Sequence, residues 1–102
     1  MTYPVISIGD DVTRQVLADA PDLMVVSFRF DKAGAIGALH RHPHLQATYV
    51  ASGSFRFTVE DNTFEVGAGD SFIIPSDALH GVVCLRPGEL IDTFTPRRDD
   101  FL

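Results

Sequence analysis

Apolar and polar residues alternate along much of this chain with a period of two, which is the pattern of a β-strand with one buried face. The alternation is clearest in LMVVSFRF, residues 23–30, and in SFRFTVE, residues 54–60. In both segments large apolar side chains occupy every second position, and serine, arginine, threonine and glutamate fall between them. We therefore predict two strands, each with one face in a hydrophobic core.

Shorter apolar runs predict the remaining strands, and turn-forming residues separate them. We expect strands at residues 5–8, 13–17, 47–51, 63–66, 71–74, 80–85 and 90–94. The turns are expected at residues 9–11, 18–21, 31–34, 52–53, 61–62, 67–70 and 86–88. A helix over residues 12–20 is the alternative to the second strand, but its periodicity is poor. Turns about every eight to twelve residues are typical of an all-β sandwich or barrel.

The composition indicates a folded protein with a single domain, residues 1–102. Apolar residues make up 45% of the chain, far more than a disordered segment contains. The formal net charge is −6 and Lys32 is the only lysine, which argues against a nucleic-acid partner. No apolar run approaches the roughly 20 residues that cross a bilayer, so we expect no membrane association. A single cysteine and the lack of a signal peptide lead us to expect a cytoplasmic protein.

Three of the four histidines lie within the pentapeptide HRHPH, and the fourth is His80. Residues two apart point to the same face of a strand, so His40 and His42 can act together. Neutral imidazole is the commonest protein ligand for transition metals, and a third imidazole from a distant strand would complete a site for Zn, Ni, Mn or Fe. The alternative is a hydrogen-bonded histidine pocket without metal. Because Pro43 interrupts the alternation, we expect His44 to contact a substrate at the rim rather than to bind the metal.

Asp92 shares one face of the last expected strand with Leu90 and Phe94. If that face is the inner one, Asp92 projects into an apolar interior, where a carboxylate is unfavourable unless it is paired or kept for function. Arg97 and Arg98 follow, and a guanidinium group can hold a carboxylate with two hydrogen bonds, whether that of Asp92 or of a substrate. The alternative is a solvated, charged tail. We expect that alternative for Arg97, Asp99 and Asp100.

The spacing of these residues resembles the two sequence motifs of the cupin superfamily. In the first motif, glycines flank a histidine pair and a glutamate; the matching residues are Gly34, His40, His42, Gln46 and Gly53, with glutamine in place of glutamate. In the second, the matching residues are Gly69, Pro75, His80 and Cys84, with cysteine in place of asparagine. The resemblance implies a small jelly-roll barrel, or double-stranded β-helix, with a metal near its open end. It also implies that one divalent ion per chain is bound by His40, His42, Gln46 and His80.

Gln46 departs from the cupin pattern in a way that affects the chemistry. A neutral amide leaves the full 2+ charge on a metal, which makes the metal a stronger Lewis acid towards an anionic substrate. The amide also stabilises a higher oxidation state less well than a carboxylate does, which disfavours oxygen-activating iron. The alternative is that Gln46 forms hydrogen bonds in the pocket and does not bind the metal.

Three longer stretches, GALHRHPHLQATYVASGSFRFTV, IIPSDALHG and DTFTPRRDDFL, closely resemble the pectin-degradation cupins of the KdgF type. This resemblance implies a metal-dependent enzyme that opens and ketonises 4,5-unsaturated monouronates from pectin or alginate. The products would be linear 5-keto-4-deoxyuronate-type sugars. The resemblance also implies catalytic roles for Asp92 and Arg98, with Arg98 and Phe94 contacting the uronate.

Two other functions are compatible with the same residues, and the barrel also implies a mode of assembly. The first alternative is an iron-dependent cupin dioxygenase, and the second is a sugar-binding cupin without turnover. A small barrel also leaves strand edges to cover, and pairing around a two-fold axis covers them. We therefore expect a homodimer that uses a strand near residues 5–8 or 13–17.

Overall fold

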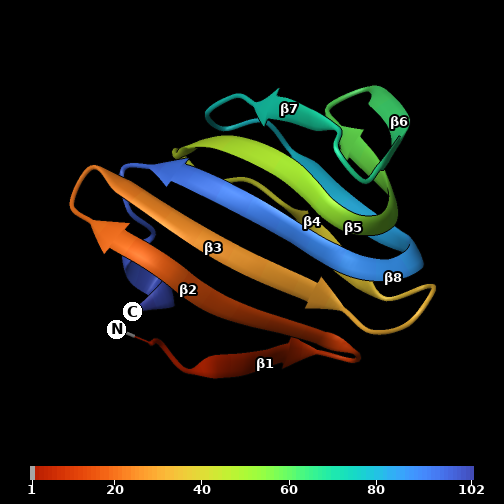
Figure 1. Cartoon of the computed structure of the whole chain (residues 1–102). Coiled ribbons are helices and arrows are strands. Elements are labelled where there is room, and N and C mark those ends of the chain that lie inside the picture. The colour runs from red at the N-terminus through yellow and green to blue at the C-terminus, as the bar shows by residue number, and fades with distance from the viewer. Residues whose placement is uncertain (1) are drawn as a thin grey trace.

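Two long antiparallel strands, β5 (Leu45–Val59) and β8 (His80–Thr95), run through the whole structure and carry most of its other strands (Figure 1). The structure is a computed structural model that describes residues 2–102. β5 and β8 pair along their lengths, from Leu45 opposite Thr95 to Val59 opposite His80. At 15 and 16 residues, they are long enough for each to take part in both walls of a barrel.

The remaining strands add to one wall or the other, and each has a defined partner. They are β1 (Val5–Gly9), β2 (Val12–Ala20), β3 (Leu23–Phe30), β4 (Ile36–His40), β6 (Asn62–Gly67) and β7 (Ser71–Ile74). β1, β2 and β3 form an antiparallel series against the second half of β8, while β7 pairs with the first half of β5. The other wall consists of β4, the first half of β8, the second half of β5, and β6. This arrangement confirms the predicted all-β jelly roll.

The predicted turns at residues 52–53 and 86–88 are wrong, because β5 and β8 continue through them. The β5–β8 ladder is irregular between Val50 and Phe55, and Gly53 has a φ of +78°, which favours glycine. The two strands approach so closely here that a side chain at Gly88 would collide with the Ser52 backbone. The turn-forming residues therefore bend paired strands from one wall into the other without reversing the chain.

Smaller differences concern the first half of the chain and one hairpin. β2 extends through the expected break at residues 18–20, with a register shift between Val16 and Ala18, and the helical alternative is wrong. β4 was not among the predicted strands. The β5–β6 turn is Glu60–Asp61, one residue earlier than expected, and Val59 pairs directly with Asn62.

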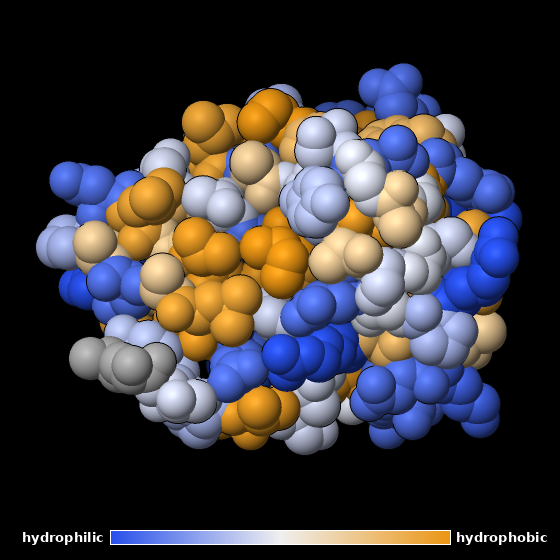
Figure 2. All heavy atoms as spheres, in the orientation of Figure 1, coloured by the Kyte–Doolittle hydropathy of each residue, from blue (hydrophilic) through white to orange (hydrophobic). Residues whose placement is uncertain are grey.

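The barrel interior contains two hydrophobic clusters, one along the middle of the long strands and one near the C-terminal end of β8. The larger includes Phe30, Val50, Phe55, Cys84 and Leu90; the smaller includes Val16, Met24, Val26 and Phe94. Apolar side chains also gather on the outer surface over β2, β3 and β8, as Figure 2 shows. Among residues 2–102, no helix has the length and hydrophobicity to cross a membrane.

Candidate metal centre and adjoining cavity

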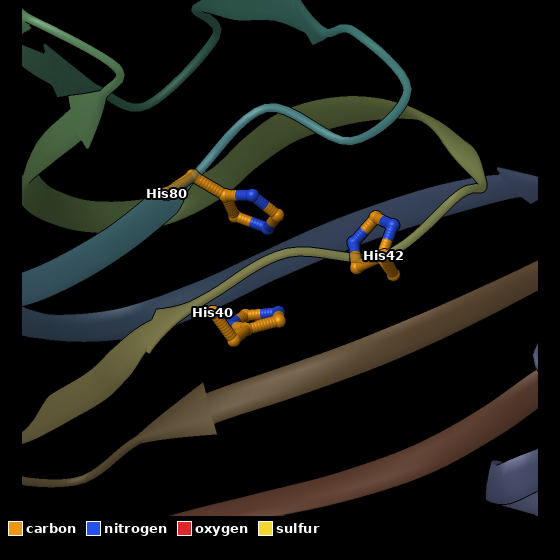
Figure 3. A group of neighbouring side chains, drawn as sticks. All are labelled: His40, His42 and His80. Atoms are coloured by element: carbon orange, nitrogen blue, oxygen red, sulfur yellow. The ribbon is translucent and has the colours of Figure 1, made fainter.

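Three histidine rings converge at one end of the barrel (Figure 3). His40 is the last residue of β4 and lies opposite His80, the first residue of β8, because these two strands pair. His42 reaches the same point from the segment that follows β4. One nitrogen of each ring lies within 4.8 Å of the others. The structure thus brings together the three imidazoles that the sequence indicated.

Backbone carbonyl groups select the same tautomer for all three neutral rings. Nδ1 of His40 and Nδ1 of His80 each lie 2.8 Å from the carbonyl oxygen two residues earlier. Nδ1 of His42 lies 3.1 Å from the carbonyl oxygen two residues later. A carbonyl only accepts, so Nδ1 carries the hydrogen, and in the neutral ring Nε2 keeps its lone pair. This second hydrogen bond is typical of metal-binding histidines.

Gln46 adds an oxygen to the three nitrogens. Its amide nitrogen donates to Oγ1 of Thr48 at 3.0 Å, which turns its carbonyl oxygen towards Nε2 of His42 at 3.1 Å. With Nδ1 protonated, both of these facing atoms are acceptors, and a cation bound by both would relieve their repulsion. Three imidazole nitrogens and one amide oxygen form a donor set suited to a divalent transition metal.

The electrostatics favour the neutral imidazoles that metal binding requires. Burial, together with the positive charges of Arg98 and His80, lowers the pKa of His42 to about 4. Burial also lowers the pKa of His80. At neutral pH neither ring needs to lose a proton before it binds a metal.

Asp92 is connected to this centre through Thr48. The Thr48 hydroxyl accepts from Gln46 and donates to Oδ1 of Asp92 at 2.7 Å. Asp92 points into the barrel from β8 and is only 6% exposed. Burial raises the pKa of Asp92 to about 7, although hydrogen bonds from Thr48 and Gln46 and the charge of Arg98 act in the opposite direction. A carboxyl group with that pKa can give or take a proton at neutral pH.

Arg98 does not form an ion pair with Asp92. Its Nε and Nη2 atoms donate to the two carboxylate oxygens of Asp100, at 3.0 and 2.9 Å. The guanidinium carbon lies 5.2 Å from the centre of the Phe94 ring and 4.2 Å from that of Phe101. Arg98 therefore brings a positive charge to the site with one edge of its guanidinium group already occupied.

The C-terminal segment packs against the barrel, so the expected solvated tail is wrong for Arg97, whereas Asp99 and Asp100 are exposed as expected. Arg97 holds both carboxylate oxygens of Asp19, on β2, at 3.0 and 2.7 Å. A short 3-10 turn, η1 (Asp99–Phe101), then places Phe101 edge-on against Phe94. These contacts hold Arg98 near the cavity.

A cavity of about 850 Å³ opens beside the histidines. Of the predicted site residues, those on its wall are His40, Gln46, His80, Asp92, Phe94 and Arg98. His44 is not on the wall: its Nε2 lies 3.1 Å from the Arg97 carbonyl, and its ring contacts Phe94 edge-on. This position supports the C-terminal segment and gives no support to a substrate contact by His44.

Sequence reasoning missed two residues of this region, Thr48 and Arg14. Thr48 lies two positions after Gln46 on the inward face of β5, and Arg14 lies between the buried Val12 and Val16 on β2. In both cases the signal was a polar residue at an inward position of an alternating segment. Arg14 lines the same cavity.

Comparisons with known proteins agree with this geometry. The family described as Cupin domain matches residues 27–94. The chain is 43% identical over 97 residues to Pectin degradation protein KdgF of Dickeya dadantii, covering 93% of this chain and 87% of that protein. A crystal structure of an RmlC-like cupin from Shewanella frigidimarina is 43% identical with a TM-score of 0.92, covering 98% and 89% of the two chains. The structure of KdgF from Halomonas sp. is 38% identical with a TM-score of 0.91, covering 98% and 92%.

Proposed function

The chain belongs to the cupin family, and from this premise we propose that it opens and ketonises 4,5-unsaturated monouronates released from pectin or alginate. Similarity to KdgF, a pectin degradation protein, supports the substrate class. The observation that carries the proposal is the buried Asp92, whose pKa is about 7 and which shares one cavity wall with His40 and His80.

The proposed cofactor is one divalent transition-metal ion per chain, Zn, Ni, Mn or Fe. The residues that would hold it are His40, His42 and His80 through Nε2, and Gln46 through Oε1. When bound, such an ion supplies Lewis-acid stabilisation of negative charge on a substrate oxygen. Gln46 contributes no charge of its own, which favours an anionic substrate.

The proposed reaction is an isomerisation that consumes no oxidant. The substrate is a cyclic hemiacetal whose C4–C5 double bond is conjugated to its carboxylate. Ring opening breaks the bond between C1 and the ring oxygen. The proton of the C1 hydroxyl group moves to the former ring oxygen, which leaves an aldehyde at C1 and an enol at C5. Ketonisation then removes the enol proton and adds a proton at C4. Atoms and electrons balance through proton transfers alone.

Asp92 is the proposed proton carrier. Thr48 donates its only hydroxyl hydrogen to Oδ1, so Oδ1 acts as an acceptor and Oδ2 is the atom that carries the exchangeable proton. A pKa of about 7 matches this role, because both protonation states are populated at neutral pH. Arg98 provides positive charge for the uronate carboxylate, and Phe94 provides an apolar surface for the sugar ring.

The decisive experiment is a time course of an unsaturated monouronate with the purified, metal-loaded protein. We expect loss of the alkene ultraviolet absorbance together with NMR signals of a linear keto sugar. Oxygen uptake without alkene loss would instead support the dioxygenase, and tight binding without either change would support a sugar-binding protein.

We also propose a homodimer with β1 in the contact. β1 is an edge strand of the sheet, and its Val5, Ile6 and Ile8 are 53%, 41% and 42% exposed. Exposed apolar side chains on an open edge favour association with another chain. A second copy would cover both the edge and these side chains.

A further inference from the structure

The cavity wall contains a second guanidinium group, that of Arg14, for which the reaction proposed above gives no role. Arg14 projects inward from β2 between Val12 and Val16, which are 3% and 5% exposed. Arg14 itself is half-buried, and a charged group held partly out of water is stabilised by a partner of opposite charge. Its presence therefore calls for an explanation.

Arg14 and Arg98 differ in what they already bind. Arg98 has two nitrogen atoms engaged by the carboxylate of Asp100. Arg14 forms no hydrogen bond or ion pair with any residue in the range 2–102, and its guanidinium carbon lies 4.2 Å from the centre of the Phe101 ring. The N–H donors of Arg14 are thus available to bind an anion, whereas some of those of Arg98 are already used by Asp100.

The two arginines lie together against one aromatic ring and share one carboxylate partner. The guanidinium carbon of Arg98 lies 4.2 Å from the centre of the same Phe101 ring. Asp100 is the one carboxylate that pairs with either group within residues 2–102. Burial lowers the pKa of Arg14, Asp100 raises it and Arg98 lowers it, as expected for two like charges with one counter-charge. A bound anion could pair with Arg14, the guanidinium group that Asp100 leaves without an ion pair.

The spacing also suits a monosaccharide. β2 is separated from β8 by one strand, β3, so the β2 and β8 backbones lie about 10 Å apart at the usual strand separation. Arg14 lies opposite Phe28, which lies opposite Leu90, and Asp92 is two residues further along the same face of β8. One sugar ring can therefore reach Arg14 at one end and Asp92 at the other.

We propose that Arg14 binds the substrate carboxylate with its free guanidinium edge and thereby gives the cavity its selectivity for sugar acids over neutral sugars. This inference rests on the proposed function for the identity of the substrate. It adds a second arginine to the expected contact by Arg98, because Asp100 occupies one edge of the Arg98 guanidinium group. Arg98 then contributes positive charge near the carboxylate, and Arg14 forms the hydrogen bonds that orient it.

The competing explanation is that Arg14 only supports the C-terminal segment by stacking on Phe101. The two roles are separable, because a support acts on every ligand alike whereas a carboxylate contact acts on acids alone. The test uses metal-loaded wild type, Arg14→Gln and Arg14→Lys, with Arg86→Gln as the control. Arg86 is an exposed residue of β8 outside the cavity wall, and its replacement removes the same charge.

The measurements are NMR titrations with D-galacturonate and with neutral D-galactose, and kinetics with an unsaturated monouronate. We expect Arg14→Gln to bind galacturonate roughly 10- to 100-fold more weakly and to raise KM similarly, the usual effect of a lost charge-assisted contact. Galactose binding should not change. Arg14→Lys should recover part of the loss, and Arg86→Gln should behave as wild type.

Three outcomes would overturn the role of Arg14. They are wild-type galacturonate affinity in Arg14→Gln, an equal loss for galactose and galacturonate, and a wild-type protein that prefers neither sugar. Failure of the proposed reaction is distinguishable from these. It would appear as no alkene loss with wild type, while galacturonate binding still depended on Arg14.

Discussion

Thr48 and Asp92 face each other across the β5–β8 ladder, and a 2.7 Å hydrogen bond joins their side chains. The bond has a fixed direction, because the Thr48 hydroxyl already accepts from the amide of Gln46. Gln46 also faces His42, so a proposed metal ligand and a proposed proton carrier share one hydrogen-bonded chain. A change at Gln46 is therefore expected to alter the hydrogen bonding, and with it the pKa, of Asp92.

Replacing Asp92 by Asn should slow turnover of an unsaturated monouronate by roughly 10²- to 10⁴-fold, the usual contribution of a general acid or base. Asparagine keeps the shape but cannot exchange a proton. Metal content should stay at the wild-type level, since Asp92 is not a proposed ligand. Asp61→Asn, in the exposed β5–β6 turn, serves as the control. Wild-type turnover in metal-loaded Asp92→Asn would rule out the proton-carrier role.

Replacing His40 and His42 together by Ala should abolish metal binding, because two of the four proposed ligands are lost. Elemental analysis after dialysis is the measurement, with one divalent ion per chain expected for wild type. His44→Ala is the matched control and should keep its metal, since Nε2 of His44 faces the Arg97 carbonyl. Stoichiometric metal in the double variant would refute the assignment.

The stability of the metal-free protein should fall with rising pH because of Asp92. Its pKa is raised to about 7 in the folded state, above its unfolded value, so its stabilising contribution is full below about pH 4. That contribution is lost as the pH rises to about 7. The loss is on the order of 1–4 kcal/mol, since a pKa difference of one corresponds to about 1.4 kcal/mol.

Urea denaturation of metal-free wild type and Asp92→Asn between pH 4.5 and 8 tests this expectation. The variant lacks the titrating group, so its stability relative to wild type should increase with pH and level off above neutrality. His42 and His80 have lowered pKa values and destabilise both proteins at acid pH, so their effect cancels in the comparison. A difference that does not vary with pH would contradict the prediction.

The proposed homodimer predicts that light scattering will give about twice the monomer mass, which is 11.2 kDa. Ile6→Glu places a charge on the exposed edge strand β1 and should yield monomers. Ile36→Glu, on β4, is the control and should remain dimeric, although Ile36 is also well exposed. A wild-type mass that stays monomeric at every concentration would refute the dimer.

Much of the fold could be predicted because alternation reports directly on which side chains face the core. The strand at residues 23–30 has the predicted bounds, and Asp92 lies on the inner face as expected. Turn-forming residues were less informative. Gly53 and Gly88 are of a type common in loops, but both lie within paired strands. A bend within a strand and a turn that reverses the chain use the same residue types, and only continued pairing with a partner strand distinguishes the two.

The contacts of the C-terminal segment could not be predicted. Arg97 pairs with Asp19, which is 78 residues away in the sequence, and no local pattern indicates that contact. The same limit applies to Arg98, whose partner is the neighbouring Asp100 rather than the buried Asp92. Residue types indicated that these arginines would bind carboxylates, but the choice of carboxylate depends on how the tail folds back.

The continuous course of β8 through both walls restricts how this barrel can change in evolution. His80 and Asp92 lie on one strand, so an inserted or deleted residue between them would turn one of the two side chains away from the cavity. The bend at Gly88 cannot easily absorb such a change, because the β5 backbone is pressed against it. Length variation among descendants of this sequence should therefore accumulate in the connections, such as Glu60–Asp61, and spare the interval from His80 to Asp92.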